Sequence, residues 1–274
     1  MIKVLNGAAG MGSSEVVTAI VRGAGGETPA FSEAVADCDE GLDLDSRNGD
    51  GATATAPTMQ MTFEDFTDTF DISEARAITA SGRLPVLTWE SRPIAAPNNS
   101  ADEPLYSLPA IIGDPDAGVP GSFDAYLRQY ARDIVAGGLP LGIRLNHEMN
   151  GDWYPWSEHD NQGRSINGNR PGDYVKMWRH VHEIFAEEGA GDLVVWIWAP
   201  NITNNLAPVN RVPEYLASLY PGDEYVDWVG LSGYLRPPYR ADNTMTFDYT
   251  YTPTLNQLRG ITDKPIFLAE IAAS

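Results

Sequence analysis

The chain has 274 residues, 43% of them hydrophobic, and a formal net charge of −20 at pH 7 from 38 acidic and 18 basic side chains. This length and composition fit one large α/β domain with a sizeable core. The negative charge would repel phosphate backbones and anionic lipids, so nucleic acids and membranes are excluded as expected partners and neutral substrates are favoured.

Cysteine usage and apolar runs carry little further information. The single Cys38 excludes an intrachain disulfide and does not indicate a compartment. No run approaches the roughly 18 apolar residues of a membrane span, and the first residues lack the apolar stretch of a secretory signal. We expect a soluble protein and make no prediction of its oligomeric state.

Short apolar runs that end in polar or aromatic residues alternate with segments of helical periodicity. Strands are predicted at residues 59–63, 84–90, 141–146, 193–198, 226–231 and 265–270. Helices are predicted at residues 72–80, 123–136, 171–188 and 212–219. Repeated strand–helix units predict an α/β fold of the (β/α)₈ TIM-barrel class, with the active site at the carboxyl ends of the strands.

The predicted barrel is incomplete. Only six strands are readable, residues 1–5 (MIKVL) are a doubtful first strand, and no eighth strand follows Glu270. The seventh strand would then have a free edge, which invites self-association. We predict two regions, an amino-terminal segment at residues 1–56 with little pattern and a catalytic barrel at residues 57–274.

An acidic loop lies within the amino-terminal segment. Its oxygen-bearing side chains between residues 43 and 50 resemble half of an EF-hand calcium loop. The register fails, because with Gly51 as the loop glycine the position of the bidentate glutamate holds Pro57. A solvated acidic loop is favoured over a calcium site.

The segment LNHEMNGDWYPW, residues 145–156, joins a predicted strand to an aromatic-rich loop. It begins like the zinc-protease motif H-E-x-x-H, but Gly151 stands where the second histidine is needed. We therefore predict no metal site. His147 is interpreted as a residue that positions a nucleophile or a sugar hydroxyl.

Glu148 and Glu270 each follow an apolar run at a strand end. Two carboxyl groups that face one cleft are what cleavage of a glycosidic bond requires, although each could also be a surface residue or half of a salt bridge. Arg144 lies four residues before Glu148, on one face of the same strand. A nearby arginine would favour the ionised form of Glu270, whereas an apolar setting would keep Glu148 protonated.

Aromatic and amide side chains at the strand ends supply a second requirement of sugar binding. Trp and Tyr faces pack on sugar rings, and amides bond to sugar hydroxyls. Trp153 is the leading candidate for a sugar platform. The other residues expected to bind substrate are Trp89, Glu90, Asn150, Trp156, Trp198, Asn201 and Tyr234.

Over residues 78–271 the chain resembles glycoside hydrolase family 26, the retaining (β/α)₈ enzymes best known as β-mannanases. The resemblance rests on GRLPVLTWE, LGIRLNHEMNGDWYPW, DYVKMWRHVHEIFAEEGAGDLVVWIWAPN, YPGDEYVDWVGLSGY and KPIFLAEIAAS, in family order. It implies that Glu148 is the acid/base and Glu270 the nucleophile. It also implies that His147 and Tyr234 hold the nucleophile or the sugar, and that Trp153 lines the subsite at the cleaved bond.

By this resemblance we expect a secreted endo-1,4-β-mannanase without a cofactor. The third predicted strand ends in Trp89-Glu90-Ser91, an ending similar to that of some mixed-linkage glucanases, so a β-1,3-1,4-glucanase or a β-xylanase stays open. The incomplete barrel leaves a non-catalytic glycan-binding protein as a further alternative. Retention predicts carboxyl groups about 5 to 5.5 Å apart, and inversion about 6.5 to 9.5 Å.

Overall fold

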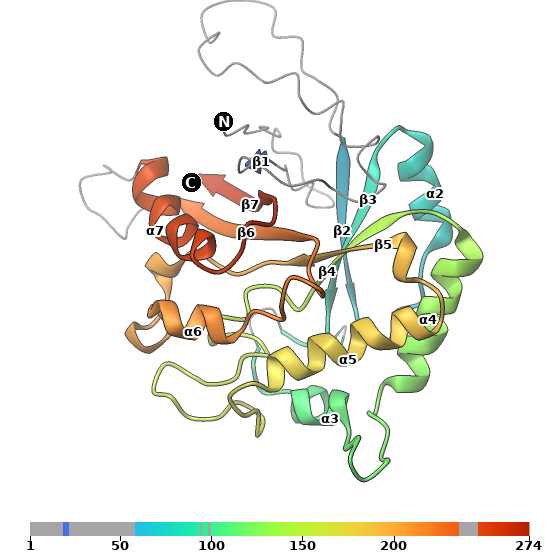
Figure 1. Ribbon diagram of the computed structural model, residues 1–274, viewed down its shortest axis with the longest axis horizontal. Helices are drawn as coiled ribbons and strands as arrows, with labels where there is room; N and C mark the ends of the chain where they lie inside the picture. Colours follow the sequence, from blue (N-terminus) through green and yellow to red (C-terminus); the bar gives the residue numbers. More distant parts are fainter. Residues whose placement is uncertain (1–18, 22–57, 94, 98–99, 236–245, 274) are drawn as a thin grey trace, which may run out of the picture.

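The computed structural model describes residues 19–21, 58–93, 95–97, 100–235 and 246–273. Six parallel strands follow one another along the chain and pair in that order, and the sheet that they form curls into part of a barrel (Figure 1). They are β2 (Met59–Asp65), β3 (Leu84–Glu90), β4 (Leu141–Leu145), β5 (Val194–Trp198), β6 (Trp228–Leu235) and β7 (Ile266–Ala273). The predicted α/β fold of an incomplete barrel is confirmed.

The prediction that the last strand has a free edge is wrong in one respect. The short strand β1 (Ala19–Val21) pairs antiparallel with β7, with Ala19 opposite Leu268 and Val21 opposite Ile266. Three residues with no alternation of their own gave no signal in the sequence. The doubtful first strand at residues 1–5 and the acidic loop at residues 43–55 both lie outside the described residues.

Helices cover the outer face of the sheet. The predicted helices correspond to α2 (Ile72–Ala80), α4 (Asp124–Gly137), α5 (Asp173–Glu187) and α6 (Pro213–Ser218). Two further helices were not predicted, α3 (Leu108–Ile112) and α7 (Phe247–Arg259). The helix α7 contains Pro253 and several threonines, which weaken its helical pattern. Single turns of 3₁₀ helix complete the description: η2 (Pro104–Tyr106), η3 (Gly191–Leu193), η4 (Thr203–Asn205) and η5 (Pro208–Asn210).

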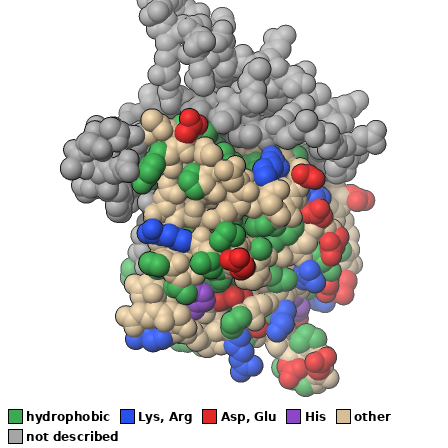
Figure 2. Space-filling model, turned by 60° about the vertical axis from the view of Figure 1, so that its left-hand side comes forward, with side chains coloured by type: hydrophobic (Ala, Val, Ile, Leu, Met, Phe, Trp, Pro, Cys, Tyr) green, Lys and Arg blue, Asp and Glu red, His purple; other side chains and the backbone are tan. Residues whose placement is uncertain are grey.

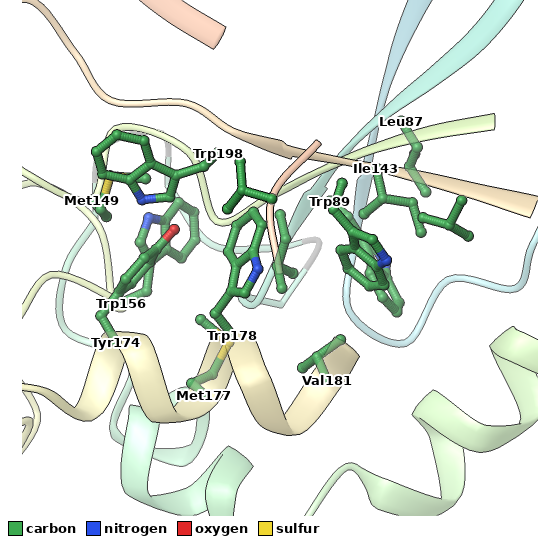
Figure 3. Close-up of a cluster of buried hydrophobic side chains, with 14 of the residues drawn as sticks. Leu87, Trp89, Ile143, Met149, Trp156, Tyr174, Met177, Trp178, Val181 and Trp198 are labelled. Carbon is green, nitrogen blue, oxygen red and sulfur yellow. The ribbon is translucent and has the colours of Figure 1, made fainter. Parts of the chain in front are cut away.

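Alternation along the strands creates two apolar layers. One side of each strand faces the inside of the curled sheet, where a small cluster forms from Met61, Val86, Val195, Ile197, Trp228, Phe267 and Ala269. The other side packs under the helices in a much larger cluster, part of which is drawn in Figure 3. A side chain that continues the inner series toward the carboxyl end of its strand therefore reaches the rim of the barrel.

A β-bulge interrupts this alternation in β7. Leu231 of β6 pairs with Leu268, but the next residue, Ser232, pairs with Glu270. One extra residue thus stands on the β7 side, and Ala269 and Glu270 both belong to the inner face. Without it, strict alternation would direct Glu270 toward the helices.

The described part of the chain contains no helix that is long and apolar enough to cross a membrane. On the face drawn in Figure 2, basic side chains lie singly among acidic and apolar ones. The described residues on that face therefore form no continuous basic stripe of the kind that tracks a phosphate backbone.

Candidate active site

The backbone after β4 is held in an uncommon conformation. Asn146 and Glu148 have φ angles of 44° and 53°, in the left-handed region that residues other than glycine seldom adopt. The side chain of Asn146 accepts a 2.8 Å hydrogen bond from the Ser91 amide, and the amide of Glu148 donates to Ala199 O over 2.7 Å. Hydrogen bonds to the residues that follow β3 and β5 therefore fix the direction in which the side chain of Glu148 points.

Glu270 is held by a buried arginine. Arg144, which is fully buried, places Nη1 2.6 Å from Glu270 Oε1, and the hydroxyl of Tyr234 donates to Oε2. Thr88 accepts a 3.2 Å bond from the same guanidinium group, and Ser232 a 2.5 Å bond. Burial is the largest single effect and raises the pKa of Glu270, but Arg144, His147 and the hydrogen bond from Tyr234 together outweigh burial and lower this pKa to about 2.

Glu148 lies in a different electrostatic setting. It is 6% exposed, its Oε2 accepts a 2.9 Å hydrogen bond from the Trp153 indole nitrogen, and the Asn201 side chain also bonds to it. Burial, followed by the negative charge of Glu270, raises the pKa of Glu148 to about 7. The pKa values of the two carboxyl groups are thus displaced in opposite directions, which favours the protonated form of Glu148 and the ionised form of Glu270.

The separation of these groups fits one stereochemical outcome. His147, Glu148 and Glu270 each offer an atom that lies within 4.8 Å of the others. Carboxyl groups with atoms this close are nearer to the separation of retaining glycosidases, about 5 to 5.5 Å, than to that of inverting ones, about 6.5 to 9.5 Å.

The same three side chains also form a group that could ligate a metal ion. Spacing along the chain could not reveal it, because Glu270 comes from another strand. The chemistry of the surroundings disfavours a cation here, since Oε1 of Glu270 is already ion-paired with the guanidinium group of Arg144 and Oε2 accepts a hydrogen bond from Tyr234.

His147 stands between two carboxyl groups. Its Nε2 is 3.7 Å from Glu270 Oε1, its Nδ1 is 3.7 Å from Glu90 Oε1, and the Tyr154 hydroxyl lies 3.4 Å from Nε2. Burial, with the charge of Arg144 adding to it, holds the pKa of His147 well below its usual range. The ring is therefore neutral at neutral pH.

Most of the residues expected at the site converge there. Besides the groups already described, Glu90 lies beside His147 and forms a 2.8 Å ion pair with Arg92. Asn150 lies one step further out, where its side chain exchanges two 2.8 Å bonds with the backbone of Asn201. Asn150 therefore positions Asn201, and among the described residues its hydrogen bonds do not involve either carboxyl group.

Three of the expected tryptophans lie in the core. Trp89, Trp156 and Trp198 are each 0% exposed, and Figure 3 shows them among apolar side chains between the strands and α5. Trp89 and Trp198 occupy the outer series of their strands, and Trp156 stacks on Tyr154 and donates to His147 O over 2.8 Å. The expectation that they present a face to a sugar is corrected, because a strand end does not by itself direct a side chain inward.

Other residues at the site escaped the sequence analysis. Thr88 and Ser232 hold Arg144, Arg92 bridges the ends of β2 and β3, and Phe63 approaches His147. A signal existed for Thr88 and Phe63, because each stands at an even separation from another inward position of its strand. No such signal existed for Ser232 and Arg92, because Ser232 pairs with Arg144 and Arg92 with Asp65, and these partners lie on distant segments of the chain.

Comparison with known proteins places this geometry in a family context. A model of glycosyl hydrolase family 26 matches residues 119–274. Endoglucanase H of Acetivibrio thermocellus is 35% identical over 156 residues, which make up 56% of this chain and 16% of that protein. Mannan endo-1,4-beta-mannosidase A and B of Caldalkalibacillus mannanilyticus is 29% identical over 140 residues, 51% of this chain and 23% of that protein. The chain spans less than a quarter of the length of either relative.

The fold is also similar to a solved structure. GH26A from Muricauda sp. aligns with a TM-score of 0.51 at 20% identity, over 79% of this chain and 68% of that one. At such an identity the likeness concerns the fold alone. The family match covers more than half of the chain and includes both Glu148 and Glu270. The chain belongs to glycosyl hydrolase family 26.

Proposed function

We propose that this chain is an endo-acting, retaining β-glycanase that hydrolyses β-1,4-mannan, with residues 57–274 as its catalytic barrel. The observation that carries the proposal is the carboxyl pair, Glu148 and Glu270, within 4.8 Å of each other and with pKa values displaced in opposite directions. The mannosidase relative supports mannan as the substrate. A polymer of this kind is met outside cells, so an extracellular location is part of the proposal.

The first half of the reaction uses the two carboxyl groups in opposite roles. An ionised Glu270 attacks the anomeric carbon, while protonated Glu148 gives its proton to the glycosidic oxygen as the carbon–oxygen bond breaks. The shortened leaving chain departs, and the remaining sugar is bonded to Glu270 as an ester. Arg144 and Tyr234 keep the attacking carboxylate ionised and oriented.

The second half restores the enzyme. Glu148, now ionised, takes a proton from water, the oxygen of that water attacks the anomeric carbon, and the bond to Glu270 breaks. Two displacements at one carbon return the sugar with its original anomeric configuration. The indole N–H of Trp153 stabilises the ionised form of Glu148 between the two steps.

A second candidate substrate is favoured by a specific observation. The relative with the higher identity, at 35%, is named an endoglucanase, and the third strand of this chain ends in Trp89-Glu90. A mixed-linkage β-1,3-1,4-glucan is therefore the alternative, followed by a xylan. The carboxyl pair serves all three, because it acts at the anomeric carbon and not on the groups that distinguish these sugars.

The experiment is a substrate panel with a nucleophile variant. The chain and its Glu270→Ala variant are assayed for reducing-sugar release on galactomannan, mixed-linkage glucan and xylan, and the first-formed anomer is followed by proton NMR. We expect cleavage of mannan with retention, and loss of about a thousandfold or more in the variant. Inversion would refute the mechanism, and release from glucan alone would replace the substrate.

Two further outcomes address the other classes of function. A folded chain that binds oligosaccharide but releases no sugar from any polymer would support a glycan-binding protein and refute the enzyme. The grouping of His147 with the two glutamates makes a metal-dependent hydrolase the remaining alternative. Because the proposed steps use only side chains and water, we expect unchanged activity after dialysis against EDTA, and activity that returns only on adding a divalent ion would contradict them.

A further inference from the structure

An exposed aromatic ring lies beside His147, on the side of the site that β2 provides. Phe63 belongs to the inner series of β2, where its neighbour in that series, Met61, is buried. Phe63 itself is 41% exposed. Its ring meets that of His147 edge-on, with 6.2 Å between centroids. The exposed part of this ring is available to a CH face of a ligand in the polar site.

A cluster of charged side chains adjoins this ring. Asp65 and Glu90 are directly opposite each other at the ends of β2 and β3, and Arg92 joins them through contacts of 3.0 Å and 2.8 Å. All three side chains are at least five-sixths buried. Within the described part of the chain, Arg92 Nη1 and His147 Nδ1 are buried without a hydrogen-bond partner.

We propose that Phe63, Asp65, Glu90 and Arg92 form a subsite for a second sugar of the glycone, next to the sugar that Glu270 attacks. The inference rests on the proposed function and adds a place where the substrate is held. The ring of Phe63 packs against a CH face of the sugar, the carboxylates accept hydrogen bonds from neighbouring hydroxyls, and the free Nη1 of Arg92 donates one.

The position of the ring decides which end of the substrate it holds. Trp153 bonds to Glu148, the group that protonates the departing oxygen, and its loop is tied through Asn150 to the end of β5. Phe63 lies on β2, on the other side of β4 in the strand order, against the histidine that approaches Glu270. The two rings therefore flank the carboxyl pair, with Phe63 on the side of the sugar that stays on the enzyme.

The charges of the subsite select a class of sugar. Asp65 and Glu90 flank one guanidinium group, burial raises the pKa of Glu90 to about 7, and the whole chain has a formal charge of −20 at pH 7. A sugar with a carboxylate of its own would be repelled, whereas a neutral hexose or pentose offers hydroxyls that satisfy both signs. The subsite is therefore expected to accept neutral glycans and to reject uronic acids.

Aryl β-glycosides separate this subsite from the rest of the cleft, because the aryl group replaces every sugar on the leaving side. The values of kcat/KM are compared for dinitrophenyl glycosides that carry one or two sugars of the type cleaved in the polymer. For Phe63→Ala we expect a loss of about tenfold with the disaccharide, the size of one stacking contact with its buried area, and little loss with the monosaccharide.

Three further variants sharpen the result. Phe63→Tyr keeps the ring and should retain the preference for the disaccharide, while Arg92→Lys keeps the charge but loses the planar fork and should lower it. Val135→Ala, at an equally exposed apolar position on α4, is the matched control and should change neither substrate. Equal losses on both substrates for Phe63→Ala, in a variant that keeps its Tm, would overturn the subsite.

The subsite and the proposed function fail in different ways. If the chain cleaves the polymer but Phe63→Ala keeps the full advantage of the second sugar, the subsite alone is refuted. If the chain cleaves no glycoside, the function is refuted, and calorimetric titration with neutral mannotetraose and cellotetraose decides about the subsite. Weaker binding by Phe63→Ala would then support it, and equal binding or no binding by the unaltered chain would overturn it.

Discussion

The indole ring of Trp153 donates a hydrogen bond to Glu148 across a glycine that leaves room for it. The bond to Oε2 is 2.9 Å long, and a Cβ placed on Gly151 would lie only 2.6 Å from two atoms of the ring. The hydrogen bond therefore requires a residue without a side chain at position 151. A methyl group at position 151 must push the indole away from the carboxyl group that it holds.

Gly151→Ala is therefore expected to lower kcat/KM on the polymer by about tenfold, the equivalent of one hydrogen bond to a charged group. Its backbone is outside the left-handed region, so the change carries no conformational penalty of that kind. The measurement is kcat/KM together with Tm. Gly191→Ala, where the added carbon finds its nearest neighbour at 3.9 Å, is the control and should keep both values. An unchanged kcat/KM in Gly151→Ala would separate Trp153 from catalysis.

Removing the donor should move the basic limb of the pH profile. The Trp153 bond favours the ionised form of Glu148 and so lowers its pKa, against the larger effects of burial and of Glu270, which raise it. In Trp153→Phe the pKa of Glu148 rises further, and the limb of kcat/KM that reports loss of the acid moves to higher pH. The profile is measured with a polymer substrate from pH 4 to 10. A basic limb that moves to lower pH would contradict the assignment of Glu148 as the acid.

The ion pair of Arg144 and Glu270 predicts the behaviour of the acid limb. The pKa of Glu270 is depressed in the folded chain, so this carboxylate stabilises the fold above its unfolded pKa of about 4.3 and loses that contribution as the pH falls below it. In Arg144→Met the pKa of Glu270 rises, and the acid limb of kcat/KM moves to higher pH.

Arg144→Lys is the matched variant, since it keeps the charge and should leave the acid limb nearer to its original position. Because breaking a buried pair costs about 3 to 5 kcal/mol, urea unfolding must accompany the kinetics. An acid limb at the same pH in a folded Arg144→Met variant would show that Arg144 does not set the ionisation of Glu270.

Trp89 tests the distinction between a core residue and a sugar platform. Its ring is fully buried and stacks on Tyr130 with 4.4 Å between centroids. Trp89→Ala should lower the free energy of unfolding by about 3 to 5 kcal/mol while kcat/KM of the folded fraction changes little. Denaturant unfolding and initial rates at low temperature measure the two effects. A large loss of kcat/KM with unchanged stability would restore the sequence-based assignment.

The sequence predicted the strands well because each one combines a short apolar run with helical pattern on both sides. It also predicted the contact of Arg144 with Glu270, since residues at even separations share a strand face and both follow buried runs. The same rule, applied to Trp89 and Glu90, would have sent these neighbours to opposite sides of β3. A position at a strand end was given more weight than alternation, and Trp89 and Trp198 were misplaced for that reason, whereas Trp156 is a loop residue that the structure buries.

The remaining errors arose from information that no local pattern contains. The strand β1 exists through its pairing with β7, and α7 forms despite Pro253 because its buried residues pack against the rest of the domain. The convergence of His147, Glu148 and Glu270 depends on two strands that lie three places apart in the sheet. Spacing within one segment can propose such residues but cannot join them.

The bulge in β7 decides which face of the sheet carries the carboxyl group of Glu270. Glu270 faces its partners only because one residue of β7 has no counterpart on β6. Straightening the strand, so that Ala269 instead of Glu270 pairs with Ser232, would leave every reactive side chain in the protein and still turn Glu270 toward the helices, where Arg144 cannot reach it. Any gapless comparison of this strand with a regular one assigns Glu270 to the wrong face. The pairing of Glu270 with Ser232, as well as the presence of the glutamate, is therefore what a descendant of this chain must keep to retain the contact with Arg144.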